Sequence, residues 1–188
     1  MTMQTVTNLA DYNIPLVTDL DGTLIKGDIL YIGILKLLKK NIFYLIKCMW
    51  WLFKGKANLK EKIFAQVYID PLLLNYNKDT MLFLKGVFEK GRKIILATAT
   101  VKSVACDIAA HCGFFSQVYG SESNINLKGS QKAKRLILQF GENGFDYIGD
   151  SSSDLFVFKF CRFAYLVNPS GKLEKETRKI AIVKNIWS

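Results

Sequence analysis

The chain has 188 residues, of which 50% are hydrophobic, so it is long enough to bury a core and too apolar to be disordered over most of its length. Its 26 lysines and arginines against 16 aspartates and glutamates give a formal net charge of +10, which favours anionic partners such as phosphorylated molecules, nucleic acid or an acidic membrane surface. One histidine and four cysteines without a CxxC pair argue against a zinc site of the usual ligand set and against a serine–histidine–aspartate hydrolase.

The cysteines and the N-terminus indicate the compartment. Nothing in the spacing of Cys48, Cys106, Cys112 and Cys161 suggests a disulfide framework, which is typical of a reducing environment. The first residues, MTMQTVTNLADYN, lack the basic and apolar regions of a secretory signal. We therefore expect a cytoplasmic protein.

Five short apolar runs predict strands, at residues 15–20, 93–99, 117–120, 145–150 and 163–168. Most are continuous rather than alternating, as in strands that are buried on both faces of a parallel sheet. Helical patterns cover residues 101–114, after the second run, and 129–141, before the fourth. This alternation of strands and helices predicts a doubly wound α/β fold.

Roughly seventy residues separate the first run from the second, far more than an ordinary connection contains, and they predict an inserted, mainly helical subdomain. Residues 28–56 within it are unusually apolar and aromatic, but lysines interrupt them well short of the roughly 20 apolar residues of a membrane-spanning helix. On one continuous helix, a single stripe would contain Lys36, Lys40, Lys47 and Lys54. Two interpretations remain open and compatible: a cap that packs on the core, or a helix in a membrane interface with lysines facing acidic headgroups.

Polar residues follow the predicted strands at the sheet edge where open parallel sheets bind ligands. Asp19, Asp21, Thr98 and Asp150 all occupy such positions. Each has a structural alternative: the aspartates suit turns or helix caps, and Thr98 could cap the next helix, as Thr100 could equally well. Their convergence favours a functional site.

Four motifs occur in a characteristic order: DLDGT (19–23), IILAT (94–98), NLKGSQK (126–132) and GDSSSD (149–154). Together they resemble the haloacid dehalogenase superfamily, which is dominated by phosphate-transfer enzymes. The resemblance implies a Rossmann-like parallel sheet with strand order 3-2-1-4-5. It places the catalytic core at residues 13–26 and 89–170, a helical cap at 27–88 and a basic C-terminal tail at 171–188.

The resemblance also implies roles for the carboxylates. Asp19 would be the nucleophile that forms an aspartyl-phosphate, a reaction that requires the charge on carboxylate and phosphate to be neutralised. Mg²⁺ would provide this through Asp19, the backbone carbonyl of Asp21 and Asp150, with Asp154 either as a supporting carboxylate behind them or as a weaker ligand. The Asp21 side chain would act as general acid and then general base, which favours a phosphatase over carbon–halogen cleavage.

Further residues would contact the phosphoryl group. By the resemblance, Thr98 donates a hydrogen bond to it and Lys128 stabilises its charge, while Lys132, one helical turn later, is a weaker candidate for the same role. Gly22 and Thr23 would turn the loop and offer backbone N–H groups to phosphate.

A closer resemblance rests on PLVTDLDGTLIKGD, LATAT, NLKGSQKAKRL, FDYIGDSSSDL and LVNPS. These segments are similar to the haloacid dehalogenase domain at the N-terminus of membrane prenyltransferases of the UbiA type. The similarity implies a lipid-linked or prenyl-linked phosphate as substrate, and contact with an acidic membrane surface or a membrane prenyltransferase.

The sequence thus predicts a Mg²⁺-dependent phosphomonoester hydrolase that acts on a lipid-linked phosphate or a small phosphorylated metabolite. Two alternatives remain: a membrane-surface module with little turnover, and a phosphotransferase or phosphomutase. Nucleic acid is not expected as a partner, because no recognised motif accompanies the positive charge.

Overall fold

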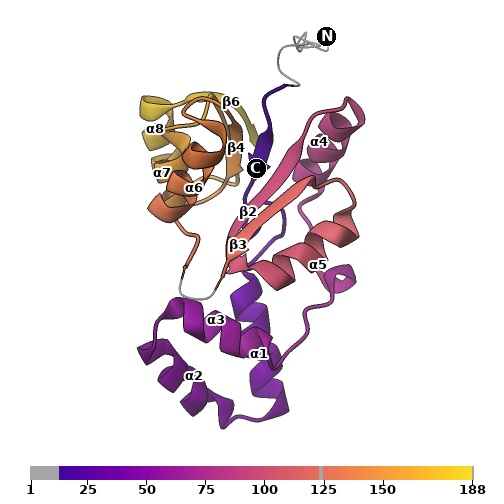
Figure 1. The fold of residues 1–188 in the computed structure, drawn as a ribbon, viewed down its shortest axis with the longest axis vertical. Helices are drawn as coiled ribbons and strands as arrows, with labels where there is room; N and C mark the ends of the chain where they lie inside the picture. Colours follow the sequence, from indigo (N-terminus) through magenta and orange to yellow (C-terminus); the bar gives the residue numbers. More distant parts are fainter. Residues whose placement is uncertain (1–12, 123–124, 188) are drawn as a thin grey trace.

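The computed structural model describes residues 13–122 and 125–187, where six parallel strands form one sheet between two layers of helices (Figure 1). The strand order is β3-β2-β1-β4-β5-β6. The strands are β1 (Leu16–Thr18), β2 (Ile94–Val101), β3 (Gln117–Ser121), β4 (Asp146–Gly149), β5 (Phe163–Val167) and β6 (Ile182–Trp187). The predicted parallel α/β sheet is confirmed, and the predicted order accounts for its first five strands.

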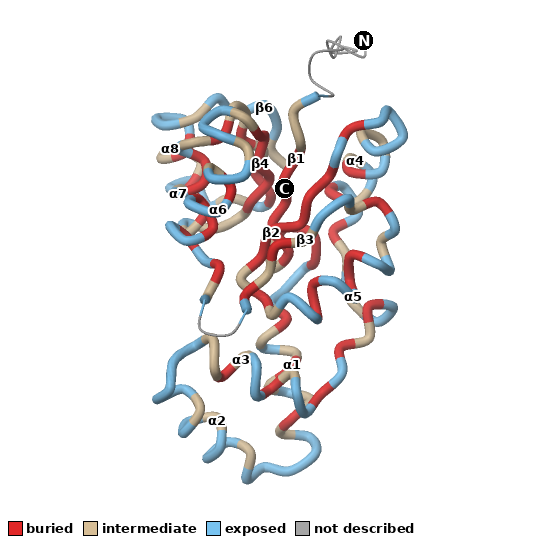
Figure 2. The backbone as a smooth tube through the Cα atoms, in the orientation of Figure 1, coloured by how far each residue is buried: buried red, intermediate tan, exposed pale blue. Residues whose placement is uncertain are grey.

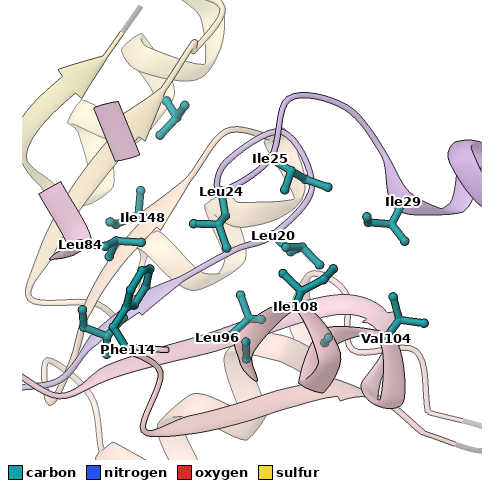
Figure 3. Close-up of a cluster of buried hydrophobic side chains, with 14 of the residues drawn as sticks. Leu20, Leu24, Ile25, Ile29, Leu84, Leu96, Val104, Ile108, Phe114 and Ile148 are labelled. Atoms are coloured by element: carbon teal, nitrogen blue, oxygen red, sulfur yellow. The ribbon is translucent and has the colours of Figure 1, made fainter. Parts of the chain in front are cut away.

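Both faces of the sheet are buried. Helices α4 (Lys78–Glu89) and α5 (Lys102–Cys112) cover one face, and α6 (Ser130–Phe140) and α7 (Leu155–Phe158) cover the other. Leu16 packs in the first of these two cores and its neighbour Val17 in the second, since successive strand side chains point to opposite faces. Figure 3 shows Leu84, Leu96 and Ile108 among the side chains of the first core, and Figure 2 shows β1, β2 and β4 as the most continuously buried strands.

The long connection after β1 forms a separate helical group beyond the carboxyl ends of the strands (Figure 1). It consists of α1 (Ile29–Lys40), α2 (Tyr44–Phe53) and α3 (Lys56–Phe64), followed by a short 3₁₀ helix, η2 (Pro71–Leu73). The group has a small core of its own, made of Leu37, Leu59, Ile63 and Val67. At its base the Lys26 N–H donates to the Asn75 carbonyl (2.7 Å) and the Asn77 N–H to the Leu24 carbonyl (2.9 Å), so the segment leaves and rejoins the core at one place.

The expected lysine stripe is wrong, because residues 28–56 do not form one helix. Helix α1 ends at Lys40, and Asn41 has an extended backbone that separates it from α2. The ammonium groups of Lys36 and Lys40 donate to the carbonyls of Tyr68 and Gln66, so these two lysines attach α1 to the chain that follows α3. Among the described residues, no helix is both long and apolar enough to cross a membrane.

The limits of the core differ from the expected ones at two places. Helix α4, which the expected limits place in the insertion, packs on the sheet through the buried Leu84, so we assign it to the core. The expected basic tail at 171–188 is instead helix α8 (Gly171–Ile180) and edge strand β6. The Trp187 ring stacks on Tyr165 (6.1 Å between centroids) and packs on Phe83 (5.0 Å), which holds β6 against β5.

Candidate active site

A cavity of about 360 Å³ lies where the carboxyl end of the sheet meets the helical group. Residues from three of the four sequence motifs line it, together with residues of the helical insertion and the two residues that directly follow the IILAT motif. The lining residues are Asp19, Asp21, Gly22, Gly27, Asp28, Leu30, Lys60, Ala99, Thr100, Lys128, Lys132, Asp150, Ser151 and Ser153. The structure therefore brings the predicted carboxylates together at one edge of the sheet.

Asp19 follows β1 directly and is held there by the sheet, because its N–H donates to the Ile148 carbonyl of β4 (3.0 Å). Its Oδ1 accepts from the Leu20 N–H (2.8 Å), and its Oδ2 lies 3.0 Å from Lys132 Nζ. Burial raises the pKa of Asp19 to about 7; the Lys132 charge opposes this rise, and the nearby Asp154 and Asp21 add to it. The ionised carboxylate is thus less stable here than in water.

Asp150 follows β4 and approaches the first loop closely. Its Oδ1 accepts from the Thr23 hydroxyl (3.1 Å). Gly22 has φ +76°, and a Cβ atom there would lie 1.9 Å from Asp150 Oδ2, so this approach requires glycine. Burial raises the pKa of Asp150 to about 6, with Asp154 adding to the rise. The Thr23 side chain therefore positions a carboxylate; phosphate contact through the backbone of Gly22 and Thr23 stays a prediction.

Asp154 is fully buried behind the other two carboxylates. It accepts hydrogen bonds from the Tyr147 hydroxyl (2.7 Å) and from the Ser151 hydroxyl (2.8 Å) and N–H (3.1 Å), and lies 3.3 Å from Lys132 Nζ. Burial alone would raise the pKa of Asp154, but the Lys132 charge and these hydrogen bonds outweigh it and hold the pKa below its usual value. Burial likewise disfavours the charged form of Lys132, and Asp19 and Asp154 reverse this, so its pKa is raised.

The donor set of Asp19, Asp150 and Asp154 fits a divalent cation. Each offers one carboxylate oxygen, and these oxygens lie within 4.8 Å of one another. Carboxylate oxygens are the ligands that Mg²⁺ prefers. The raised pKa values of Asp19 and Asp150 mean that burial disfavours their ionised forms, which a bound cation would stabilise. Asp154 already accepts several hydrogen bonds, so Asp19 and Asp150 are the better ligands.

Asp21 occupies a different part of the cavity wall. Its Oδ1 accepts from the Ile29 N–H at the start of α1 (2.7 Å), and its Oδ2 accepts from the Thr100 hydroxyl (2.8 Å). Burial raises the pKa of Asp21 although both hydrogen bonds oppose the rise. A fixed carboxyl group with a raised pKa is suited to carry a proton.

The two threonines of β2 differ from expectation. Thr98 is fully buried, its hydroxyl accepts from the Thr100 N–H (3.0 Å), and it is absent from the cavity wall. Thr100, expected only as an alternative helix cap, lines the cavity and holds Asp21. The structure thus connects the site to Thr100, and a phosphoryl contact for Thr98 stays a prediction.

The two lysines near α6 also differ from expectation in which of them pairs with Asp19. Lys132 lies on the buried face of α6 beside Ala133 and Leu136, which directs its ammonium group to Asp19. Lys128 precedes the helix and is exposed at the cavity wall. The ion pair with Asp19 therefore belongs to Lys132, the weaker candidate, because only a residue on the inner face of the helix reaches the end of β1.

Lys60, which the insertion contributes to the cavity, is not among the residues that the motifs predict. Lys60 lies on α3, and its ammonium group donates to the Ala99 carbonyl (2.6 Å) and to Asn126 Oδ1 (3.4 Å). Burial lowers the pKa of Lys60, and the charges of Asp21 and Asp28 oppose this. No motif marks a lysine in an inserted helix, so only the packing of α3 on the end of β2 identifies it.

A comparison with profiles of known protein families gives no match. The chain is 34% identical over 172 residues to the uncharacterized protein y4nM of Sinorhizobium fredii (strain NBRC 101917 / NGR234). This match covers 92% of the chain but only 33% of that relative, so the chain spans about a third of the relative's length.

Solved structures similar to the chain include phosphatases and a haloacid dehalogenase-like family hydrolase. A phosphoserine phosphatase in its apo form has a TM-score of 0.65 at 12% identity, with 94% of both chains covered. A predicted phosphatase from Clostridium acetobutylicum has a TM-score of 0.62 at 16% identity, covering 91% of this chain and 94% of the other. A haloacid dehalogenase-like family hydrolase from Streptococcus pneumoniae has a TM-score of 0.56 at 15% identity, with 93% of both chains covered. The protein therefore has the fold of the haloacid dehalogenase-like hydrolases.

Proposed function

We propose that the protein is a Mg²⁺-dependent phosphomonoester hydrolase that acts through an aspartyl-phosphate, an acyl phosphate formed on Asp19. The observation that carries the proposal is the position of Asp19: a buried carboxylate at the end of β1, paired with Lys132 and adjacent to Asp150 at the wall of a cavity. The likeness of the fold to phosphoserine phosphatase supports it.

The residues present suit such a reaction. Mg²⁺ held by Asp19, Asp150 and the Asp21 carbonyl would supply positive charge to the phosphate and to the attacking carboxylate. Lys132 neutralises Asp19 and fixes its orientation. Attack by an Asp19 oxygen forms an oxygen–phosphorus bond while the bond from phosphorus to the substrate oxygen breaks, and Asp21 gives its proton to that leaving oxygen. Asp21 then takes a proton from the water that attacks phosphorus, which releases phosphate and restores the Asp19 carboxylate.

We infer that Thr100 and Ile29 position the proton carrier. Their hydrogen bonds engage both oxygens of Asp21, so the carboxyl group cannot rotate freely. Because Ile29 begins α1, the helical insertion takes part in placing this group.

We propose an organic phosphate with an additional anionic or polar group as substrate, either lipid-linked or prenyl-linked, or a small metabolite. Lys60 and Lys128 lie at the cavity wall and do not pair with Asp19. Lys128 is exposed there, and Lys60, although it bonds to Ala99 and Asn126, adds a second positive charge for the substrate. A panel of isoprenoid, sugar and amino-acid phosphates, assayed for phosphate release, would distinguish the two classes. A reducing compartment such as the cytoplasm fits the four cysteines, all of them free.

Replacement of Asp19 tests the mechanism. Asp19→Asn should lower phosphate release from an aryl phosphate with Mg²⁺ by about a thousandfold or more, because the amide is not a nucleophile. Asp107→Asn, at an exposed position of α5, is the matched control and should keep full activity. Circular dichroism should show both variants folded. Full activity in Asp19→Asn would overturn the proposal, and transfer of phosphate to added glycerol in place of water would identify a phosphotransferase.

A further inference from the structure

Helix α2 lies at the end of the helical group away from the sheet and is exposed or half-buried along its length (Figures 1 and 2). Its exposed side chains are mostly apolar. None of its residues is buried. Trp50 is 65% exposed and Phe53 is 86% exposed. We define the α2 surface as the exposed side chains of Ile42, Phe43, Leu45, Ile46, Met49, Trp50, Leu52 and Phe53.

The α2 surface is larger than packing within the chain requires. Tyr44, Cys48 and Trp51 recur with helical spacing and pack on the small core of the helical group. A surface helix normally has polar residues opposite such a stripe, but most of the remaining residues of α2 are apolar too. A contiguous exposed apolar patch of this kind marks an interaction site.

The charge around the α2 surface has one sign. Residues 29–60 contain seven lysines and no aspartate or glutamate. Two of these lysines border the surface directly: Lys47 Nζ lies 4.7 Å from the Tyr44 ring centre, and Lys54 Nζ lies 5.9 Å from that of Trp50. Apolar side chains surrounded by lysines are complementary to a surface that is apolar below and negatively charged at its boundary.

We propose that the α2 surface docks on a lipid bilayer that contains anionic lipids. The apolar side chains enter the boundary between headgroups and acyl chains, with Trp50 and the flanking lysines at headgroup level. A second copy of the chain fits less well, because a twofold contact through α2 would bring the same lysines of both copies together. No residue of α2 lines the candidate active site, so docking leaves that cavity unblocked, and the inference does not depend on the proposed reaction.

Vesicle flotation of the full chain tests the apolar part of the proposal. The protein should float with vesicles of equal parts phosphatidylcholine and phosphatidylglycerol, and less with phosphatidylcholine alone. Trp50→Ser combined with Phe53→Ser should weaken partitioning by roughly tenfold or more. The control is Leu82→Ser combined with Leu138→Ser, at leucines that are 70% and 82% exposed on α4 and α6, and it should bind as the unaltered chain does.

Charge reversal tests the electrostatic part independently of any change in packing. Lys47→Glu with Lys54→Glu should weaken binding by roughly fivefold or more per lysine at low salt, whereas Lys134→Glu with Lys175→Glu should change it less. Circular dichroism should show that all variants keep their helix content. The proposal is overturned by absence of flotation, by equal losses in variants and controls, or by a dimer that depends on Trp50 and Phe53 while vesicles are not bound.

Discussion

The buried aspartates at the two ends of the sheet differ in how many positively charged partners they have. At the amino end, Asp146 is fully buried and bonded to two guanidinium groups: Arg162 donates to both of its oxygens (2.9 and 2.8 Å), and Arg92 also bonds to it. At the carboxyl end, Asp19 and Asp154 share the ammonium group of Lys132. One buried aspartate is thus paired with two positive charges at the amino end, whereas two aspartates share one positive charge at the carboxyl end.

This difference separates a structural cluster from a functional one. The Asp146 carboxylate, whose charge is already paired, connects β4 to the start of β2 and has no unpaired charge that a ligand would neutralise. Carboxylates whose pKa values are raised by burial lower the stability of the protein until a cation or a proton binds. Three experiments, in order of expected effect, examine this contrast.

The largest effect should come from Asp146→Ala. It leaves the guanidinium groups of Arg92 and Arg162 without their buried partner, and the free energy of unfolding should fall by about 3–5 kcal/mol. Urea denaturation with a common m-value measures this. Asp107→Ala, on the exposed side of α5, should change it by no more than about 0.5 kcal/mol. A loss for Asp146→Ala as small as the control's would show that the amino-end cluster is not the stabilising one.

A smaller effect should follow pH in the metal-free protein. The folded-state pKa values of Asp19 (about 7) and Asp150 (about 6) lie above the usual 3.8, so the stability that these groups contribute is present below pH 3.8 and is lost as the pH rises through 6 and 7. Asp154, whose pKa is lowered, changes its contribution only below 3.8. A pKa that differs by one between the folded and unfolded states corresponds to about 1.4 kcal/mol, so stability should fall by about 2 kcal/mol or more between about pH 5 and pH 8.

Mg²⁺ should oppose this fall at the upper pH, because it binds the ionised carboxylates. Urea denaturation in chelator and in excess Mg²⁺, at both pH values, measures the two effects together. Stability that stays constant with pH and does not respond to Mg²⁺ would contradict the assignment of uncompensated charge to this end of the sheet.

The smallest effect should come from Asp150→Asn. The amide carries no charge to be desolvated and still accepts the hydrogen bond from Thr23, so the metal-free protein at about pH 8 should gain about 1 kcal/mol of stability. The same variant should lose most of its stabilisation by Mg²⁺. Asp107→Asn is the control for a surface carboxylate. A clear loss of stability in metal-free Asp150→Asn would place Asp150 with Asp146 among the structural residues.

The sequence predicted the strands that are buried on both faces, because continuous apolar runs mark them directly. It missed β6, whose apolar residues are interrupted by Lys184 and Asn185 in a basic segment. Edge strands are exposed on one side, so whether such a segment forms a strand depends more on pairing and ring contacts than on its composition. The division between α1 and α2 was missed for a related reason: Asn41 alone ends a periodic pattern.

In the site, the motifs predicted the carboxylates but not all of their partners. Asp19, Asp21 and Asp150 follow strands whose ends must meet, so their convergence could be derived. The choice of Lys132 over Lys128 depends on which face of α6 packs inward, and that of Thr100 over Thr98 on which side of β2 faces Asp21. Lys60 could not be predicted, because it lies on α3 and no local sequence pattern specifies that this helix packs beside the end of β2.

The closed base of the helical insertion has an evolutionary consequence. Because the Lys26–Asn75 and Asn77–Leu24 hydrogen bonds join the two chain segments there, the intervening residues form a loop whose ends are already fixed. Doubling the length of such a loop costs only about 0.6 kcal/mol in closure entropy. The insertion can therefore be lengthened or shortened beyond the start of α1, where the Ile29 N–H holds Asp21, while β1 and the loop with Asp19 and Asp21 stay unchanged. One continuous stretch of the gene therefore encodes most of the helical wall of the cavity, and a change there leaves the codons of Asp19, Asp21 and Asp150 untouched.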